Sequence, residues 1–127
     1  MARAPWGAIL LLAAATASQA EDSPYRRFEG PSLAQGRFVW LANCETCHGY
    51  GIAGAPVPMQ PDDWRQRLAQ KQTALYRHAI EGFFGPDDAM MPARGGNPQL
   101  SDDEVRVAVD YMTALAHSYI QQTENTK

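Results

Sequence analysis

The run Cys44-Glu45-Thr46-Cys47-His48 contains the residues of this chain that are best suited to chemistry. It holds both cysteines of the 127-residue sequence, and a histidine directly follows the second one. Cys-x-x-Cys-His is the attachment pattern for c-type haem. Each thiol can add across one porphyrin vinyl group, and the adjacent imidazole can then bind the iron as an axial ligand. The run therefore predicts one covalently attached haem c, held by Cys44 and Cys47, with His48 as an iron ligand.

Three other uses of these cysteines are weaker. A zinc site needs about four soft ligands, and the sequence has no second Cys-x-x-Cys pair and no His-x3-His pair. A thiol–disulfide centre places its cysteines at the start of a helix, where the helix dipole lowers the pKa of the first thiol. Here a helical pattern runs into the motif from upstream, and glycines follow it. A purely structural disulfide leaves His48 unexplained.

The first 20 residues have the pattern of a secretion signal. Arg3 supplies the charge, Trp6 to Ala17 form an apolar stretch, and Ser18-Gln19-Ala20 is a small-x-small cleavage site. The apolar stretch is shorter than the ~20 residues needed to cross a bilayer, which favours a cleaved signal over an uncleaved anchor. Export to the periplasm agrees with the haem prediction, because bacteria attach haem c outside the inner membrane.

The charge and length of the chain limit its class of partner and its number of domains. The formal net charge is −3, and cleavage would also remove Arg3. An acidic chain argues against a nucleic-acid role and mildly favours a partner with a basic docking patch. Residues 21–127 suffice for one compact domain but not for two. We expect a flexible leader at residues 21–31 and a monohaem domain at residues 32–127.

Apolar spacing predicts an all-α fold, with no strand alternation of any length. The first helix would begin at Pro31-Ser32, with Ser32 as N-cap, and run toward Cys44. Asp62 or Asp63 would cap a second helix, and Thr73 a third that stops at Gly82. Residues 49–61 and 83–98 are rich in glycine and proline, so we expect irregular loops that cover the cofactor.

The last helix has the clearest sequence signature. Ser101 and Glu104 form a capping box at its start. One apolar stripe then follows at helical spacing: Val105, Val109, Met112, Ala116 and Tyr119.

A low-spin electron carrier needs a second iron ligand opposite His48. Met90 and Met91 lie in the second irregular segment, and spacing alone leaves both open, with Met91 slightly favoured. Met112 belongs to the apolar stripe, which predicts a core role. Met59 is too close to His48 in sequence to reach the opposite face easily.

An ordered set of residues surrounds the attachment motif. It comprises Gly36 and Trp40 before it, Gly51-Ile52-Ala53-Gly54-Ala55-Pro56 after it, then Trp64, Arg67-Leu68-Ala69, Leu75-Tyr76, Ile80-Glu81-Gly82-Phe83, Met91-Pro92-x-Arg94-Gly95-Gly96-Asn97 and Val109-Asp110-Tyr111-Met112. In this order the set resembles the bacterial class I c-type cytochromes, and most of all the short branch called cytochrome c-five. The resemblance implies a cytochrome c fold, with about four short helices and Gly/Pro-rich loops wrapped around one haem.

The same resemblance implies roles for individual residues. His48 would be the proximal ligand, and Met91 matches the position of the distal ligand. Pro56 would accept a hydrogen bond from the other ring nitrogen of His48. Trp64 would belong to the cofactor-binding residues.

Further residues are placed by the resemblance or depart from it. Gly36 and Trp40 would pack against Tyr111 where the first and last helices cross. Arg94 replaces the family's lysine, and it would either pair with a haem propionate or be solvated. Residues 84–88 resemble a small acidic insertion before the ligand loop.

These features together predict a soluble periplasmic one-electron carrier that cycles between Fe(II) and Fe(III), and no enzyme. Its partners would be redox proteins, whose identity the sequence does not give, and we expect a monomer or part of a redox complex without a membrane span. Two alternatives stay open. One is the cytochrome subunit of a periplasmic dehydrogenase complex. The other is a haem peroxidase or gas-binding protein, which requires an open sixth site.

Overall fold

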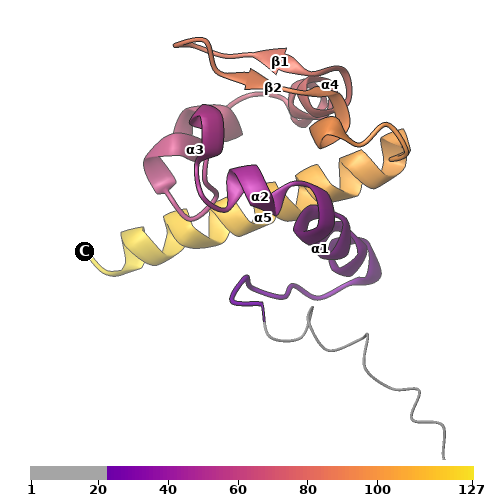
Figure 1. Cartoon of the computed structure of the whole chain (residues 1–127). Coiled ribbons are helices and arrows are strands. Elements are labelled where there is room, and N and C mark those ends of the chain that lie inside the picture. Colours follow the sequence, from indigo (N-terminus) through magenta and orange to yellow (C-terminus); the bar gives the residue numbers. More distant parts are fainter. Residues whose placement is uncertain (1–22) are drawn as a thin grey trace, which may run out of the picture.

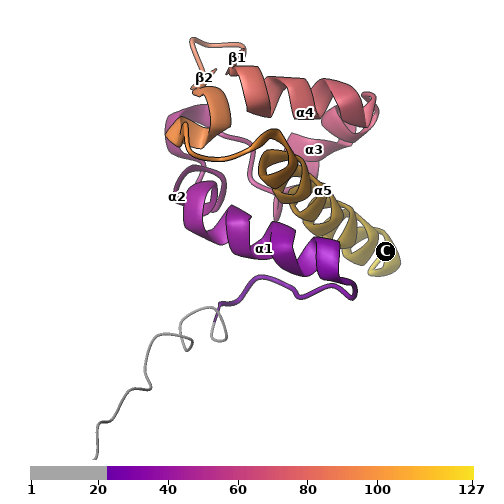
Figure 2. The same ribbon diagram turned by 90° about the vertical axis from the view of Figure 1, so that its right-hand side faces the viewer.

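The computed structural model describes residues 23–127, so the predicted signal at residues 1–20 lies outside the described residues. The described chain contains the helices α1 (Pro31–Asn43), α2 (Glu45–His48), α3 (Pro61–Leu68), α4 (Gln72–Glu81) and α5 (Asp102–Asn125), the 3-10 helices η1 (Ile52–Gly54) and η2 (Ala93–Gly96), and the strands β1 (Phe83–Phe84) and β2 (Met90–Met91). Helix α1 lies on one side of α5, and α4 with the hairpin lies on the other (Figures 1 and 2). The prediction of an all-α fold is confirmed apart from this hairpin. No helix among residues 23–127 combines the length and apolarity needed to span a bilayer.

The crossing of α1 and α5 depends on a glycine. A Cβ atom on Gly36 would lie 2.0 Å from the carbonyl oxygen of Val107 and 3.0 Å from Cβ of Tyr111. The two helix backbones therefore touch at this point. Trp40 and Tyr111 are fully buried beside it, with ring centroids 5.7 Å apart. The predicted packing of Gly36 and Trp40 against Tyr111 is confirmed.

The buried side chains form two clusters, one on each side of α5. The larger joins α1, α3 and α5 and contains Val39, Trp40, Trp64, Ala108, Tyr111, Met112, Leu115 and Ala116. The smaller joins α4 and α5 through Ala79, Val105 and Val109. Four members of the predicted apolar stripe are buried, and Tyr119 is half-buried. Helix α5 thus serves both clusters.

The N-caps of three helices lie two or three residues before the predicted ones. Helices α1 and α3 begin at Pro31 and Pro61, with Gly30 and Gln60 as N-caps, so Ser32, Asp62 and Asp63 are not caps. Proline suits the first helical position because its fixed φ is already helical and its missing N–H would be unpaired there anyway. Helix α4 likewise begins at Gln72, after Lys71, and not at a Thr73 cap.

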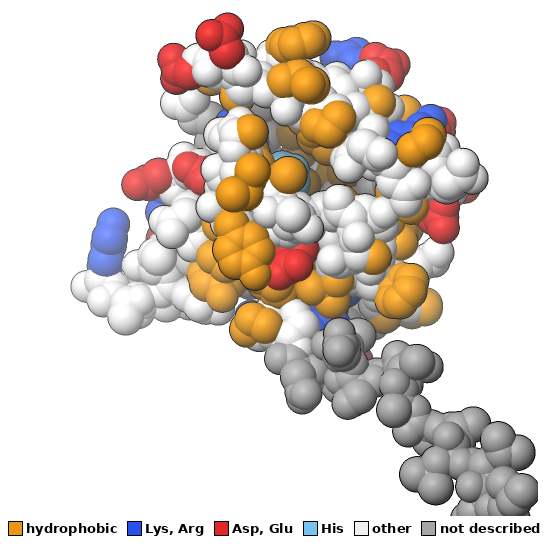
Figure 3. All heavy atoms as spheres, in the orientation of Figure 1, with side chains coloured by type: hydrophobic (Ala, Val, Ile, Leu, Met, Phe, Trp, Pro, Cys, Tyr) orange, Lys and Arg blue, Asp and Glu red, His pale blue; other side chains and the backbone are white. Residues whose placement is uncertain are grey.

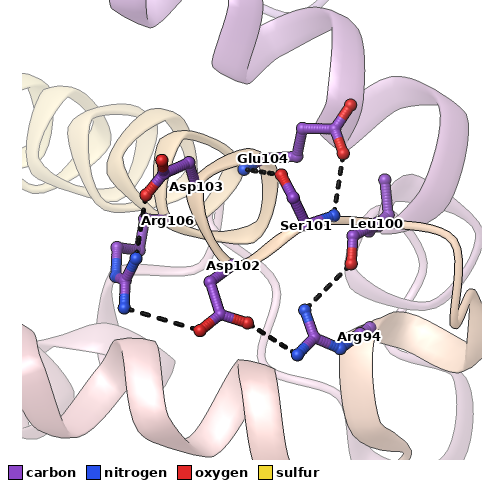
Figure 4. A network of polar contacts seen from close by, with 7 residues as sticks. All are labelled: Arg94, Leu100, Ser101, Asp102, Asp103, Glu104 and Arg106. Atoms are coloured by element: carbon purple, nitrogen blue, oxygen red, sulfur yellow. Dashed lines mark hydrogen bonds and ion pairs between the residues drawn. The ribbon is translucent and has the colours of Figure 1, made fainter.

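The predicted end of α4 and the predicted start of α5 are confirmed. Helix α4 stops at Gly82, whose φ of 88° takes the chain out of the helix. At the start of α5, Glu104 N–H donates to Ser101 Oγ over 3.1 Å, and Ser101 N–H donates to Glu104 Oε2 over 2.8 Å (Figure 4). This reciprocal pair is the predicted capping box.

The segment predicted to be irregular at residues 83–98 contains a β-hairpin. Phe83 pairs with Met91, and Phe84 pairs with Met90. Ala89 N–H donates to Pro86 C=O over 3.1 Å, and the two central residues, Asp87 and Asp88, have φ of 56° and 60°. Positive φ at both positions is typical of a type I′ turn, the tight turn that suits the twist of a hairpin. Strands of two residues leave no alternation for sequence reasoning to detect.

Residues 23–30 were predicted to be part of a flexible leader, but they pack against the helices. Arg37 Nε donates to the carbonyl of Tyr25 over 3.2 Å, and Tyr111 Oη donates to the carbonyl of Arg26 over 2.8 Å. The rings of Tyr25 and Trp40 form a T-shaped pair with centroids 4.9 Å apart. This segment therefore covers the α1–α5 crossing.

Candidate haem site

An apolar cavity with about 330 Å³ of empty space, part of it open to solvent, brings together several of the residues that the sequence singled out for chemistry. Its lining residues are Cys44, His48, Ala79, Met91, Arg94, Gly95, Leu100, Val105, Ala108, Val109 and Met112. The hollow opens on the face shown in Figure 3, where apolar side chains surround it. The lining residues come from α2, α4, β2, η2 and α5, together with Cys44 after α1 and Leu100 before α5. Flat apolar cofactors are held by surroundings of this kind.

His48 ends the short helix α2 and is buried. Its Nδ1 lies 2.8 Å from the carbonyl oxygen of Pro56. Burial lowers the pKa of His48, and the nearby Arg67 charge lowers it further, although the bond to Pro56 acts in the opposite direction. A neutral ring donates from Nδ1 to the carbonyl and keeps its lone pair on Nε2 for a metal ion. The hydrogen bond implied by the family resemblance is therefore present.

Cys44 follows α1 directly and is half-buried, whereas Cys47 on α2 is exposed, and no disulfide joins them. Burial, together with the neighbouring Cys47, raises the pKa of Cys44 to about 11. Redox-active thiols have lowered pKa values, so this environment does not suit a thiol–disulfide centre. Within residues 23–127 no three His, Cys, Asp or Glu side chains gather as a metal site. This finding gives no support to the zinc alternative.

The hairpin separates the two candidate methionines. Successive side chains of a strand point to opposite faces, so Met90 and Met91 face different ways on β2. Met91 is half-buried, lines the cavity and packs against the cluster of Ala79, Val105 and Val109. Met90 is 51% exposed and is not among the lining residues. Met91 thus faces the site, and the Phe84–Met90 pair lies on the opposite, exposed face of the hairpin.

The unpaired indole N–H of Trp64 bears on whether the site fits a haem. Its indole is buried in the larger cluster, and its Nε1–H has no acceptor among the described residues. Buried donors without acceptors are rare because they cost about 1–3 kcal/mol. A carboxylate oxygen, such as one of a haem propionate, would satisfy this donor. Neither Trp64 nor Pro56 lines the cavity. Pro56 is connected to it through His48, and Trp64 packs in the larger cluster, which also contains the lining residues Ala108 and Met112.

Arg94 lines the cavity, but its guanidinium group is bonded to other residues of the protein (Figure 4). Nη1 donates to the carbonyl of Leu100 over 2.9 Å, and Nη2 lies 2.6 Å from Asp102 Oδ1. Asp102 also faces Arg106, at 3.7 Å. These bonds connect the loop after Met91 to the start of α5. The sequence placed Arg94 at the site but predicted a propionate partner or a solvated side chain, and it did not predict the bond to Asp102. The only signal of Asp102 was its place inside the capping box.

Some lining residues carried no chemical signal in the sequence. Ala79, Leu100 and Ala108 form part of the wall. These residues contribute only a small side chain or an apolar surface to the wall of the cavity. A pattern search for reactive residues does not find such positions, because only the fold shows which face of a helix borders the cavity.

Comparison with known proteins decides the family. Residues 31–112 match the family model described as "Cytochrome C oxidase, cbb3-type, subunit III". This chain belongs to the bacterial class I c-type cytochromes. Cytochrome c-555 of Prosthecochloris aestuarii is 41% identical over 83 residues, which cover 63% of this cytochrome and 84% of that protein. Cytochrome c5 of Ectopseudomonas mendocina is 34% identical over 75 residues, which cover 58% and 80%.

A solved structure supports the same assignment. A chain in the crystal structure of an electron transfer complex of nitrite reductase with cytochrome c is 31% identical, with a TM-score of 0.57. The match covers 70% of this cytochrome and 99% of that chain. Cytochromes of this family bind haem c covalently, with its iron, and are electron-transfer proteins. The chain is therefore a small haem c electron carrier.

Proposed function

We propose that this cytochrome is a periplasmic one-electron carrier whose haem iron is bound by His48 and Met91. One observation carries the proposal: an imidazole with an oriented Nδ1, a thioether and the Cys44 thiol line the same apolar cavity. Cys44 and Cys47 would hold the cofactor through thioethers. When bound, haem c supplies an Fe(II)/Fe(III) couple that takes up and releases one electron at a time.

Each protein group has a distinct task in this proposal. The Pro56 carbonyl fixes the plane of the His48 ring and keeps its proton on Nδ1. The Met91 thioether is a weak donor, which favours the reduced state and raises the potential. The walls from α4 and α5 exclude water and disfavour the extra charge of the oxidised state. Trp64 Nε1–H offers a bond to a propionate oxygen.

Location and partners complete the proposal. Residues 1–20 would direct export and then be removed, which leaves one monohaem domain to meet its partners outside the inner membrane. The structurally similar cytochrome c chain lies in an electron transfer complex with nitrite reductase. That complex supports redox proteins as the class of partner here. An exchange of electrons at a small contact area suits a monomer or a loosely held member of a redox complex.

Absorption spectra of the periplasmic protein, recorded before and after reduction with dithionite, test the proposal. We expect a sharp c-type band after reduction and a weak far-red sulfur-to-iron band in the oxidised protein. Mass spectrometry should show a mature chain that begins after Ala20 and carries the added mass of one haem. Colourless exported protein with two free thiols would contradict the proposal. A haem protein without the far-red band would instead favour the peroxidase or gas-binding alternative.

A further inference from the structure

Two segments border the mouth of the cavity: residues 44–57, which contain the attachment motif, and residues 83–93, which contain the hairpin. They meet at the rim, because a Cβ atom on Gly54 would lie 3.1 Å from Cβ of Ala89. The hairpin tip is therefore part of the same surface as the loop after the haem motif. We call these two segments together the mouth rim.

The mouth rim exposes large apolar side chains. Phe84 is 81% exposed, Tyr50 69%, Ile52 53% and Met90 51%. Figure 3 shows apolar side chains around the hollow on this face. Single exposed apolar residues are ordinary, but a group of them around a functional opening is typical of an interaction surface. The paired positions of Phe84 and Met90 on neighbouring strands place both on the same face of the hairpin.

The charges of the mouth rim all have the same sign. Its two segments contain three carboxylates, Glu45, Asp87 and Asp88, and neither lysine nor arginine. Asp87 and Asp88 are exposed at the hairpin turn, beside Phe84 and Met90. Arg94, which lines the cavity next to the rim, has its charge paired with Asp102. A partner would therefore meet apolar surface with an acidic edge.

We infer that the hairpin tip, Phe84–Met90, is the docking site for a redox protein whose contact face is apolar in the centre and lined with lysine or arginine. The inference rests on the proposed carrier function and adds the chemistry of the partner. The type I′ turn holds the tip in one shape, so docking requires little ordering of the chain. Opposite charges raise the rate of encounter, and the apolar side chains exclude water at the contact.

The experiment uses the reduced holoprotein and two small oxidants of opposite charge. Tris(1,10-phenanthroline)cobalt(III) is a cation with an apolar exterior, and ferricyanide is an anion. In each reaction one electron passes from the ferrous haem to the oxidant, which leaves ferric haem and cobalt(II) or ferrocyanide. Stopped-flow absorption at low and high ionic strength gives the second-order rate constants.

Two variants probe the tip. At low ionic strength the double variant Asp87→Asn/Asp88→Asn should react with the cobalt cation about threefold to tenfold more slowly and with ferricyanide faster. Both effects should shrink at high salt. Asparagine tolerates the left-handed conformation of both positions, so the turn is retained. Phe84→Ser should slow the cobalt reaction by about threefold and leave the ferricyanide reaction nearly unchanged.

A control of equal charge makes the result specific. Asp103→Asn/Glu124→Gln also removes two negative charges, but from exposed positions on α5 outside the mouth rim. It should change either rate less than twofold. Equal effects of the two double variants would overturn the docking inference and leave the carrier function intact. A reduced holoprotein that gives no electron to either oxidant would overturn the proposed function as well.

Discussion

Met90 and Met91 are chemically identical neighbours, and the strand that carries them gives them different surroundings. Met91 belongs to the face that borders the cavity, and Met90 belongs to the exposed face. We expect Met91→Ala to abolish the far-red sulfur-to-iron band of the oxidised holoprotein and to lower its potential, because the thioether, a weak electron donor that favours the reduced iron, is lost. Met90→Ala should leave the band in place.

Absorption spectra and redox titration of the two variants check this assignment. Each replaces a methionine by the same residue, so Met90→Ala serves as the matched control for Met91→Ala. Loss of the band in Met90→Ala alone would show that the hairpin register is shifted by one residue in the holoprotein.

Sequence reasoning at the residue scale succeeded where chemistry requires a particular residue type. The cysteines and His48 form a contiguous motif, and Pro56 was found through the family pattern. The choice between two methionines was harder, since it depends on which face of a strand each occupies, and two-residue strands leave no pattern. The bond between Arg94 and Asp102 also depends on how a loop folds back onto a helix.

Helices α1 and α5 approach closely at Gly36, where any side chain would overlap the Val107 carbonyl. Alanine is a better helix former than glycine by about 1 kcal/mol, so an isolated helix would gain from Gly36→Ala. In the folded protein we expect the opposite result: a loss of about 1–3 kcal/mol, because the helices must move apart.

Chemical denaturation followed by circular dichroism measures the effect of Gly36→Ala. Gln35→Ala provides the control, since residue 35 is exposed on the same helix, and it should change the free energy of unfolding by less than about 0.5 kcal/mol. If Gly36→Ala were equally mild, the close approach of the two helices would be disproved.

Helix α4 is held to α5 by hydrogen bonds to Asp110. Tyr76 Oη donates to Asp110 Oδ1 over 2.5 Å, and Gln72 Nε2 donates to the same oxygen over 3.0 Å. Burial, then the bond to Asp110 and its charge, raise the pKa of Tyr76 above its ordinary value of 10.0. Since the fold favours the neutral phenol, this contribution is complete below about pH 10 and is lost as the pH rises through the raised pKa.

The unfolding free energy should therefore fall in alkaline solution, and Tyr76→Phe should make that fall shallower. At pH 7 the variant should be less stable by about 1 kcal/mol, because one hydrogen bond is lost. Urea titrations at pH 7 and at several alkaline values measure both effects. If the unfolding free energy of the wild type and of Tyr76→Phe fell equally steeply with alkaline pH, Tyr76 would not contribute to this loss of stability.

At the element scale, sequence reasoning predicted the main helices, was less accurate for their starts, and missed the β1–β2 hairpin. The capping box of α5 and the stop at Gly82 were found because side-chain bonds and positive φ leave clear local signals. The starts of α1 and α3 were misplaced because a polar residue near a proline was taken as the cap, whereas the proline itself begins the helix.

For the whole molecule, the all-α fold followed from apolar spacing and from the family pattern. The packing of residues 23–30 could not be predicted, because the proline and glycine of this segment resemble those of a loose linker. Its anchoring comes from tertiary contacts, namely the bonds of its carbonyls to Arg37 and Tyr111. Contacts between residues far apart in sequence leave no local pattern to read.

The two buried clusters of the molecule meet at a cavity and not at a continuous core. Ala79, Val105 and Val109 lie on one side of it, and the cluster around Trp40 and Leu115 lies on the other. Small domains have little apolar surface to bury, so a large apolar cofactor that fills this space should contribute strongly to stability. The double variant Cys44→Ala/Cys47→Ala, which cannot attach haem, should lose the cooperative thermal transition and much of its helical signal.

Far-ultraviolet circular dichroism of the purified variant, recorded during heating, tests this dependence. Thr46→Ala changes an exposed residue between the two cysteines, and it should retain haem, helical signal and a sharp transition. Cys44→Ala and Cys47→Ala remove little volume themselves, so a large loss must come from the missing cofactor. If the haem-free chain melted as cooperatively as Thr46→Ala and at a similar temperature, the polypeptide would form its core alone. The cavity would then be a preformed pocket, and haem would not act as the central part of the hydrophobic core.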